Sequence, residues 1–166
     1  AWGTQFILRG LAQGAPPEEW NISRPEAVAA VARDYAHAGS EVVLTNSFGG
    51  SEFQLQRHGL ADKVYEINRR AAELSRDGAG KAVVVGGDIG PSGKMILLGE
   101  VTEDQLTDGF AAQAQGLLDG GADWIVIETM SDLTEMLCAI RGVRRNSTVP
   151  VVASMTYEPG EQGYRT

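Results

Sequence analysis

The chain has 166 residues, 43% of them hydrophobic and 22% charged, with a formal net charge of −8 at pH 7, a balance typical of one globular domain. The acidic surface excludes nucleic acid as a partner, and no apolar run approaches the roughly 20 residues that would cross a membrane. The single cysteine, Cys138, excludes an intrachain disulfide and fits a cytoplasmic protein.

The first predicted helix covers residues 25–38. Ser23 can cap it, Pro25 suits the first helical turn, and apolar residues recur at helical spacing after it. Gly39 follows the helix as a residue that readily takes the left-handed conformation. The apolar run at 41–45 then predicts the first strand.

A second helix is predicted over residues 60–77, with Gly78 as its end, followed by a strand over 82–86. Like the first apolar run, this strand is rich in valine and lacks clean alternation. That composition is typical of strands that are covered on both faces.

The third helix begins with the spacing of a capping box, Thr102 followed three residues later by Gln105, and runs to residue 119. A buried strand follows over 124–128. The remaining elements are a helix capped by Ser131 or Asp132 that runs to about residue 144 and a strand over 149–155.

The alternation of strands and helices predicts a parallel sheet in an α/β fold. Each predicted strand ends in polar residues, and in such folds the carboxyl ends of the strands carry the chemistry. Composition and spacing do not distinguish a closed barrel from an open doubly wound sheet. Four strands would be half of an eight-stranded barrel.

Two strand ends contain candidate ligand-binding side chains. In the segment after the first strand, Thr45 and Asn46 either satisfy the loop backbone or hold a polar group of a substrate. Glu128 follows a buried strand, where a carboxylate must be paired or in use. It forms either a salt bridge inside a barrel or a contact to a ligand ammonium group.

The glycine-dense segment 86–93 lacks the lysine-hydroxyl ending of a phosphate-binding loop. A shaped, mobile loop over a pocket, with Asp88 anchoring its backbone, is the favoured interpretation. Gly3 belongs either to a turn into a helix or to a segment that lets a ligand approach closely. Cys138 lies among apolar helical residues and is interpreted as a core residue rather than a nucleophile.

Six segments in order resemble the signatures of the homocysteine S-methyltransferase family, the homocysteine-binding domain of methionine synthases and betaine-homocysteine methyltransferases. The resemblance runs nearly end to end. It implies a (βα)8 TIM barrel, with residues 1–166 forming a single partial domain that covers about the first half, roughly strands 2–5. The segments are AWGT at 1–4, PEEWN at 17–21, TNSFG at 45–49, GDIGPSG at 87–93, ETMSDL at 128–133 and SMTY at 154–157.

The resemblance implies methyl transfer from a methyl donor to the thiol of homocysteine, which gives methionine. A thiol with a pKa of about 8.5 is a poor nucleophile at neutral pH, and a bound zinc ion would hold it as the thiolate. The donor cannot be read from the sequence: cobalamin or folate, betaine-like and S-methylmethionine-type donors all occur in the family. No catalytic residue is assigned, and the substrate-binding residues implied are Gly3, Thr4, Thr45, Asn46, Asp88 and Glu128.

The family's zinc-binding cysteines lie in two segments of the second half of the barrel, and neither segment is present, so the 166-residue chain alone is expected to be inactive. Both chain ends look cut, which predicts either a missing C-terminal half or a homo-oligomer that covers the exposed sheet edges. The alternatives are a non-catalytic half-barrel that serves binding or assembly, another small-molecule methyltransferase barrel, and another α/β enzyme such as a barrel that binds phosphate or a pterin. A shortage of basic residues near the strand ends disfavours the last.

Overall fold

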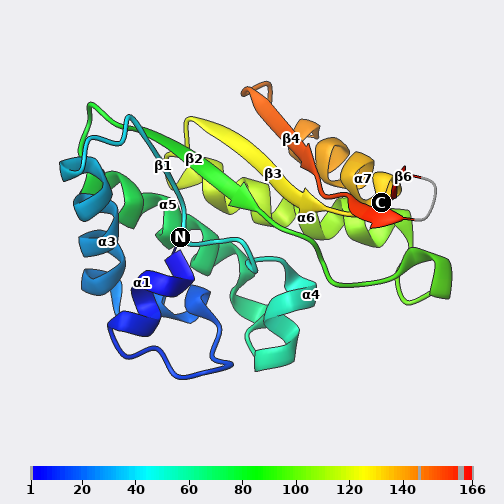
Figure 1. Cartoon of the computed structure of the whole chain (residues 1–166), viewed down its shortest axis with the longest axis horizontal. Helices are drawn as coiled ribbons and strands as arrows, with labels where there is room; N and C mark the ends of the chain where they lie inside the picture. The colour runs from blue at the N-terminus through cyan, green and yellow to red at the C-terminus, as the bar shows by residue number, and fades with distance from the viewer. Residues whose placement is uncertain (1, 146, 161–162, 166) are drawn as a thin grey trace.

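The computed structural model describes residues 2–145, 147–160 and 163–165. Four parallel strands form one sheet in the order β1-β2-β3-β4 (Figure 1). Because the order in the sheet equals the order in the chain, the sheet winds in one direction, as in a barrel, whereas a doubly wound sheet reverses at a switch point. The strands are β1 (Val42–Leu44), β2 (Val84–Ile89), β3 (Trp124–Met130) and β4 (Val151–Met155).

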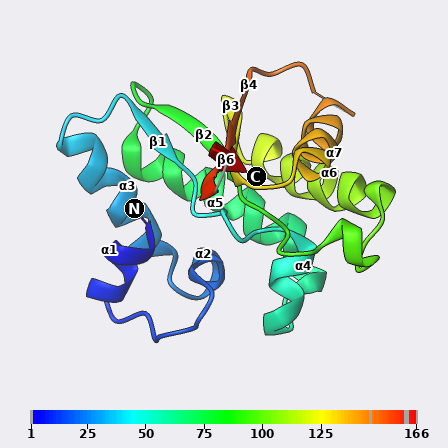
Figure 2. The ribbon, with the colours of Figure 1, turned by 45° about the vertical axis from the view of Figure 1, so that its right-hand side comes forward.

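Four longer helices follow one another over one face of this sheet, each packed against the next (Figure 1): α3 (Pro25–His37), α5 (Val64–Ala79), α6 (Glu103–Asp119) and α7 (Leu133–Arg144). Figure 2 shows the short helices α1, α2 and α4 grouped below the sheet. None of the described helices has the length and apolar character to cross a membrane. The shorter elements are α1 (Trp2–Leu8), η1 (Pro17–Glu19), α2 (Trp20–Ser23), α4 (Glu52–Leu55), η2 (Gln56–His58), η3 (Ala61–Lys63), η4 (Ile96–Leu98) and the antiparallel hairpin β5 (Glu158–Gly160)–β6 (Gly163–Arg165).

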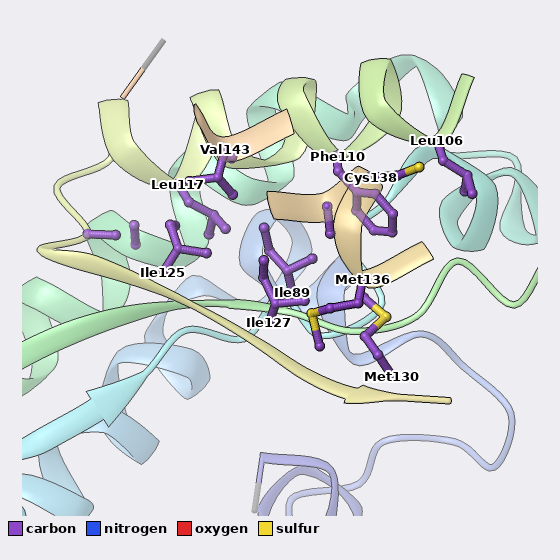
Figure 3. Close-up of a cluster of buried hydrophobic side chains, with 14 of the residues drawn as sticks. Ile89, Leu106, Phe110, Leu117, Ile125, Ile127, Met130, Met136, Cys138 and Val143 are labelled. Atoms are coloured by element: carbon purple, nitrogen blue, oxygen red, sulfur yellow. The ribbon is translucent and has the colours of Figure 1, made fainter. Parts of the chain in front are cut away.

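The largest core cluster lies between the sheet and the helices α6 and α7 (Figure 3). Ile125 and Ile127 of β3 pack there with Phe110 and Leu117 of α6, and all four side chains are completely buried. Cys138 lies in the same cluster and is also completely buried, which confirms that it is a core residue.

The opposite face of the sheet is much less covered. Val42 and Val84 pair across β1 and β2, and Val126 of β3 pairs with Val152 of β4. Side chains of Val42, Val84 and Val152 are 45%, 41% and 50% exposed, although valine in a parallel sheet is normally buried. The uncovered apolar face is therefore the one that does not carry the helices.

Capping signals predicted the starts of α6 and α7 correctly, but Ser23 does not cap α3: it is the last residue of α2, and the N-cap residue of α3 is Arg24, with no side-chain cap. The capping box between Thr102 and Gln105 is present at the start of α6. Asp132, not Ser131, caps α7, because its Oδ1 accepts the N–H groups of Thr134 and Glu135. Each of these signals acts within one helical turn, so its effect does not depend on the rest of the fold.

The predicted end of the second helix at Gly78 is wrong. Helix α5 begins at Val64, after a separate 3-10 turn, and continues through Gly78 to Ala79. Gly80 follows it with φ +83° and ψ 175°, an extended conformation of positive φ that is essentially confined to glycine, and there the helix ends. Gly78 has a different role, because a Cβ there would overlap the backbone carbonyl of Ala29 in α3.

The second strand lies at 84–89 rather than at the predicted 82–86. Gly86 and Gly87 are strand residues, not loop residues. A Cβ on Gly86 would lie 2.8 Å from the Trp124 ring, and one on Gly87 would lie 2.6 Å from Ile125 Cδ1. The glycines are thus required by close packing within and against the sheet.

Replacing Gly78 by alanine should force α3 and α5 apart and lower the free energy of unfolding by about 1–3 kcal/mol. Gly3→Ala is the matched control, because its Cβ would meet no atom within 4 Å. We expect the free energy of unfolding of Gly3→Ala to lie within about 0.5 kcal/mol of the wild-type value or slightly above it. Urea unfolding of the two variants would contradict this packing role if they were equally stable.

Candidate functional site

A cavity of about 570 Å³ lies at the carboxyl ends of β1, β2 and β3. Three parts of the chain form most of its wall: the start of α1, the turn before and within η1, and the segment that follows β1. The lining residues are Trp2, Gly3, Gly14, Ala15, Pro16, Pro17, Glu18, Leu44, Thr45, Asn46, Ser47, Phe48, Gly49, Gln54, His58, Asp88 and Glu128.

The structure brings most of the sequence-predicted site residues to this one cavity. Those that line it are Gly3, Thr45, Asn46, Asp88 and Glu128. Thr4 is the exception, because it lies in α1 with an exposed side chain and is not part of the lining. The close spacing of Gly3 and Thr4 in the sequence did not reveal that a helix turns their side chains in different directions.

The Thr45 hydroxyl is used inside the protein. Its Oγ1 accepts the backbone N–H of Asp88 at 2.9 Å and lies 2.5 Å from Ser47 Oγ. Ser47 Oγ in turn donates to the Asp88 carbonyl at 2.7 Å. Since Ser47 donates there, Thr45 is the donor in the contact between the two hydroxyls. Both hydroxyls therefore fix the backbone position of Asp88.

Asn46 is likewise engaged within the protein. Its Nδ2 donates to the carbonyl of Pro17 at 2.8 Å and to Asn21 Oδ1 at 2.9 Å. Asn21 returns a hydrogen bond from its Nδ2 to the Asn46 carbonyl at 2.8 Å. This reciprocal pair ties the turn around η1 to the end of β1 and so shapes the cavity wall.

Asp88 and Glu128 place two carboxyl groups on neighbouring strands. Asp88 is only 4% exposed, and its Oδ1 has no hydrogen-bond partner among the described residues. Burial raises the pKa of Asp88 to about 8, aided by the charges of Glu128 and Glu18 and by a hydrogen bond to Glu128. The Asp88 carboxyl is thus largely protonated at neutral pH.

A backbone irregularity accompanies Glu128. The pairing register between β3 and β4 shifts between Ile127 and Met130, and Thr129 has φ +63°. A positive φ is costly for a β-branched residue, and such strain concentrates at functional sites. The bulge returns Met130 to the buried core while Glu128, on the other side of Ile127, lines the cavity.

Sequence reasoning missed Glu18 as a site residue. Glu18 is buried in the cavity wall, and its Oε1 accepts the N–H of Gly49 at 2.7 Å. Burial raises its pKa, while hydrogen bonds from the backbone and the nearby His58 oppose the rise. The only available signal was its place in the PEEWN segment, since its contact to Gly49 links residues 31 positions apart.

The loop after β2 is anchored differently from the prediction. Glu135 Oε1 accepts the N–H of Ser92 at 2.7 Å, Gln54 Nε2 donates to the Pro91 carbonyl at 3.1 Å, and Arg57 donates to the Gly93 carbonyl at 3.1 Å. These side chains hold the loop, and the Asp88 side chain does not. No lysine or arginine lines the cavity in the described part of the chain, which agrees with disfavouring phosphate binding.

No three His, Cys, Asp or Glu side chains within residues 2–145, 147–160 and 163–165 are grouped so that they could hold a metal ion. Cys138 lies in the core cluster on the helix side of the sheet, whereas the cavity lies at the strand ends. The described donors therefore do not fit a thiolate-bound zinc ion.

Comparison with known proteins gives a consistent result. The family model described as homocysteine S-methyltransferase matches residues 2–166. The methionine synthases of Mycobacterium leprae and Mycobacterium tuberculosis are 32% and 33% identical over 149 residues, which is 83% of this chain but only 12% of each of those proteins.

Crystal structures of the homocysteine methyltransferase MmuM from Escherichia coli have a similar fold. The metallated form matches 91% of this chain and 59% of its own with a TM-score of 0.77 at 20% identity, and the apo form matches 98% and 61% with a TM-score of 0.73 at 21% identity. The parallel sheet and its helices thus correspond to part of that homocysteine methyltransferase barrel, and the chain spans less than two thirds of the relatives it matches.

Asp88→Asn should remove a pH dependence of stability. The folded protein keeps the Asp88 proton up to about pH 8, whereas an unfolded chain loses it near 3.8. Wild-type stability therefore falls as the pH rises between these values and levels off above them. Relative to wild type, Asp88→Asn should become increasingly favourable from pH 5 to pH 8, as measured by urea unfolding.

The exposed residue Asp77 provides the matched control, because Asp77→Asn makes the same chemical change outside the cavity. Its stability curve should run parallel to that of the wild type. A parallel curve for Asp88→Asn as well would show that the folded protein does not retain the Asp88 proton.

Proposed function

The chain belongs to the homocysteine S-methyltransferase family, and we propose that it provides the pocket for the amino-acid end of homocysteine in an enzyme that methylates the homocysteine thiol to give methionine. The observation that carries this proposal is the pair of carboxyl groups of Asp88 and Glu128 in a cavity that has no lysine or arginine in its described lining. Such a site suits a ligand ammonium group and repels phosphate.

The residues around the cavity have different roles in this proposal. Glu128 contacts the α-ammonium group directly, because it lies at a strand end with a partly exposed side chain. Gly3 leaves open space beside α1, since a Cβ there would meet nothing within 4 Å. Thr45 and Asn46 are positioning residues, because the Thr45 hydroxyl and the Asn46 side-chain nitrogen are already engaged within the protein.

Zinc would supply the thiolate form of homocysteine in this chemistry. The donors in the described part of the chain do not fit such a zinc ion. Its own residues act on the amino-acid end of the substrate: they bind the ammonium group, orient it and keep the neighbouring carboxyl groups away from bulk water. We further propose a cytoplasmic location, in keeping with the single, buried Cys138.

Glu128→Gln should weaken homocysteine binding, because an amide replaces the charge that faces the ammonium group. We expect the dissociation constant of L-homocysteine to rise about 10- to 100-fold, measured by calorimetry on the full-length protein. Glu66→Gln, at an exposed position on α5, is the matched control and should bind like the wild type. Equal affinity in both variants would argue against the proposed role of this cavity.

Cys138→Ala tests the position of the metal site. Because Cys138 is completely buried in the helix-side core, we expect the zinc content of the full-length protein, measured by mass spectrometry of the elements, to stay unchanged. The variant should lose only about 1 kcal/mol of unfolding free energy. Stoichiometric loss of zinc from a variant that stays folded would place Cys138 among the ligands instead.

A further inference from the structure

The two carboxyl groups of the cavity come together because of strand register. Asp88 pairs with Val126 across β2 and β3, so Glu128 follows two residues later on the same face of the neighbouring strand. The Asp88 side chain is buried, and its Oδ1 has no hydrogen-bond partner among the described residues although it belongs to the cavity lining. A buried polar atom of this kind calls for a partner that a ligand can supply.

The charges that face Asp88 all have the same sign. The charges of Glu128 on β3 and Glu18 on η1 both raise the pKa of Asp88, and the charge of His58 on η2 acts on Glu18. The described cavity lining includes no lysine or arginine. Without a ligand, the proton on Asp88 relieves the repulsion between these groups, and burial together with Glu128 raises the pKa of Asp88 to about 8. A bound ammonium group would relieve the same repulsion in place of the proton.

We propose that Asp88 is a second anionic contact for the α-ammonium group of the ligand, and that Asp88 releases one proton to solvent when this group binds. The inference rests on the proposed function in taking an amino acid as the ligand. The step is balanced: the O–H bond of the Asp88 carboxyl breaks, the proton passes to the buffer, and the carboxylate forms an ion pair with the ammonium group. Nothing is oxidised or reduced.

This coupling has a defined pH dependence. Below the pKa of Asp88 a proton competes with the ligand, so affinity increases as the pH rises toward that value. For a pKa of about 8, the affinity for an amino acid should increase about 16-fold between about pH 6.5 and pH 8. Asp88→Asn has no proton to lose, so its affinity should stay nearly constant over this range.

The test uses calorimetry on the full-length protein with L-methionine as the probe, because methionine carries the ammonium group but no thiol whose own proton would be counted. Titration at pH 7 in two buffers of different ionisation enthalpy gives the number of protons released. We expect nearly one proton for the wild type and for Asp77→Asn, and none for Asp88→Asn. The desamino analogue 4-(methylthio)butanoate should release none from any of the three.

The outcomes separate this inference from the proposed function. Methionine that binds to the wild type without proton release overturns the role of Asp88 and leaves the homocysteine pocket standing. Absence of binding by both methionine and homocysteine overturns the proposed function and, with it, the ammonium contact. Equal proton release by methionine and by its desamino analogue also overturns the inference, because the ammonium group would then not be its cause. The wild-type measurements with methionine and its desamino analogue test the inference even if Asp88→Asn fails to fold.

Discussion

The structure depends on hydrogen bonding to one largely buried stretch of backbone, residues 45–50, which follows β1. Buried backbone groups need partners, and this stretch is too irregular to find them all in a sheet. Three amide side chains from three different helices supply them: Asn21 of α2 donates to the Asn46 carbonyl, Asn68 of α5 to the Gly50 carbonyl and Gln113 of α6 to the Ser47 carbonyl, each at 2.8 Å. These contacts fix the helices relative to the strand end, and the cavity takes its shape from them.

The same network explains which groups are left for a ligand. The hydroxyls of Thr45 and Ser47 hold Asp88 in place through its backbone N–H and carbonyl, so they are already occupied. The Asp88 side chain is hydrogen-bonded to that of Glu128, another carboxyl, and its Oδ1 has no hydrogen-bond partner among the described residues. A buried carboxyl without a cation costs free energy, and folded proteins keep such groups chiefly where function uses them. In the proposed site, binding is thereby separated from positioning: the hydroxyls and amides hold the backbone in place, and the carboxyl groups are left for the ligand.

The sequence predicted those features that depend on neighbouring residues and missed those that depend on contacts between distant segments. The capping box at Thr102 works within one turn, and it gave the start of α6 correctly. Gly78 and Gly87 were misassigned because their role is to admit another segment, at Ala29 or Ile125, which is remote in sequence. Strand ends identified Asp88 and Glu128 because parallel strands bring their carboxyl ends to one edge. No such rule predicts that Glu18 lies in the cavity wall, because its position depends on the course of the chain through η1.

The uncovered sheet face and the carboxyl pair belong together. The sheet face that carries Asp88 also carries Val42, Val84 and Val152. Paired residues on neighbouring strands point to the same face, as do residues an even number of positions apart along one strand, and these rules connect all four residues. In a barrel of parallel strands whose helices form the outer ring, the face without helices is the interior, and the chain matches only 59% of the MmuM polypeptide. A cover over these valines would bury apolar surface and also restrict water around the strand ends. In the resulting lower dielectric the attraction between the carboxyl pair and an ammonium group would increase. Closure of the sheet and recognition of the amino acid would then reinforce each other through the same face.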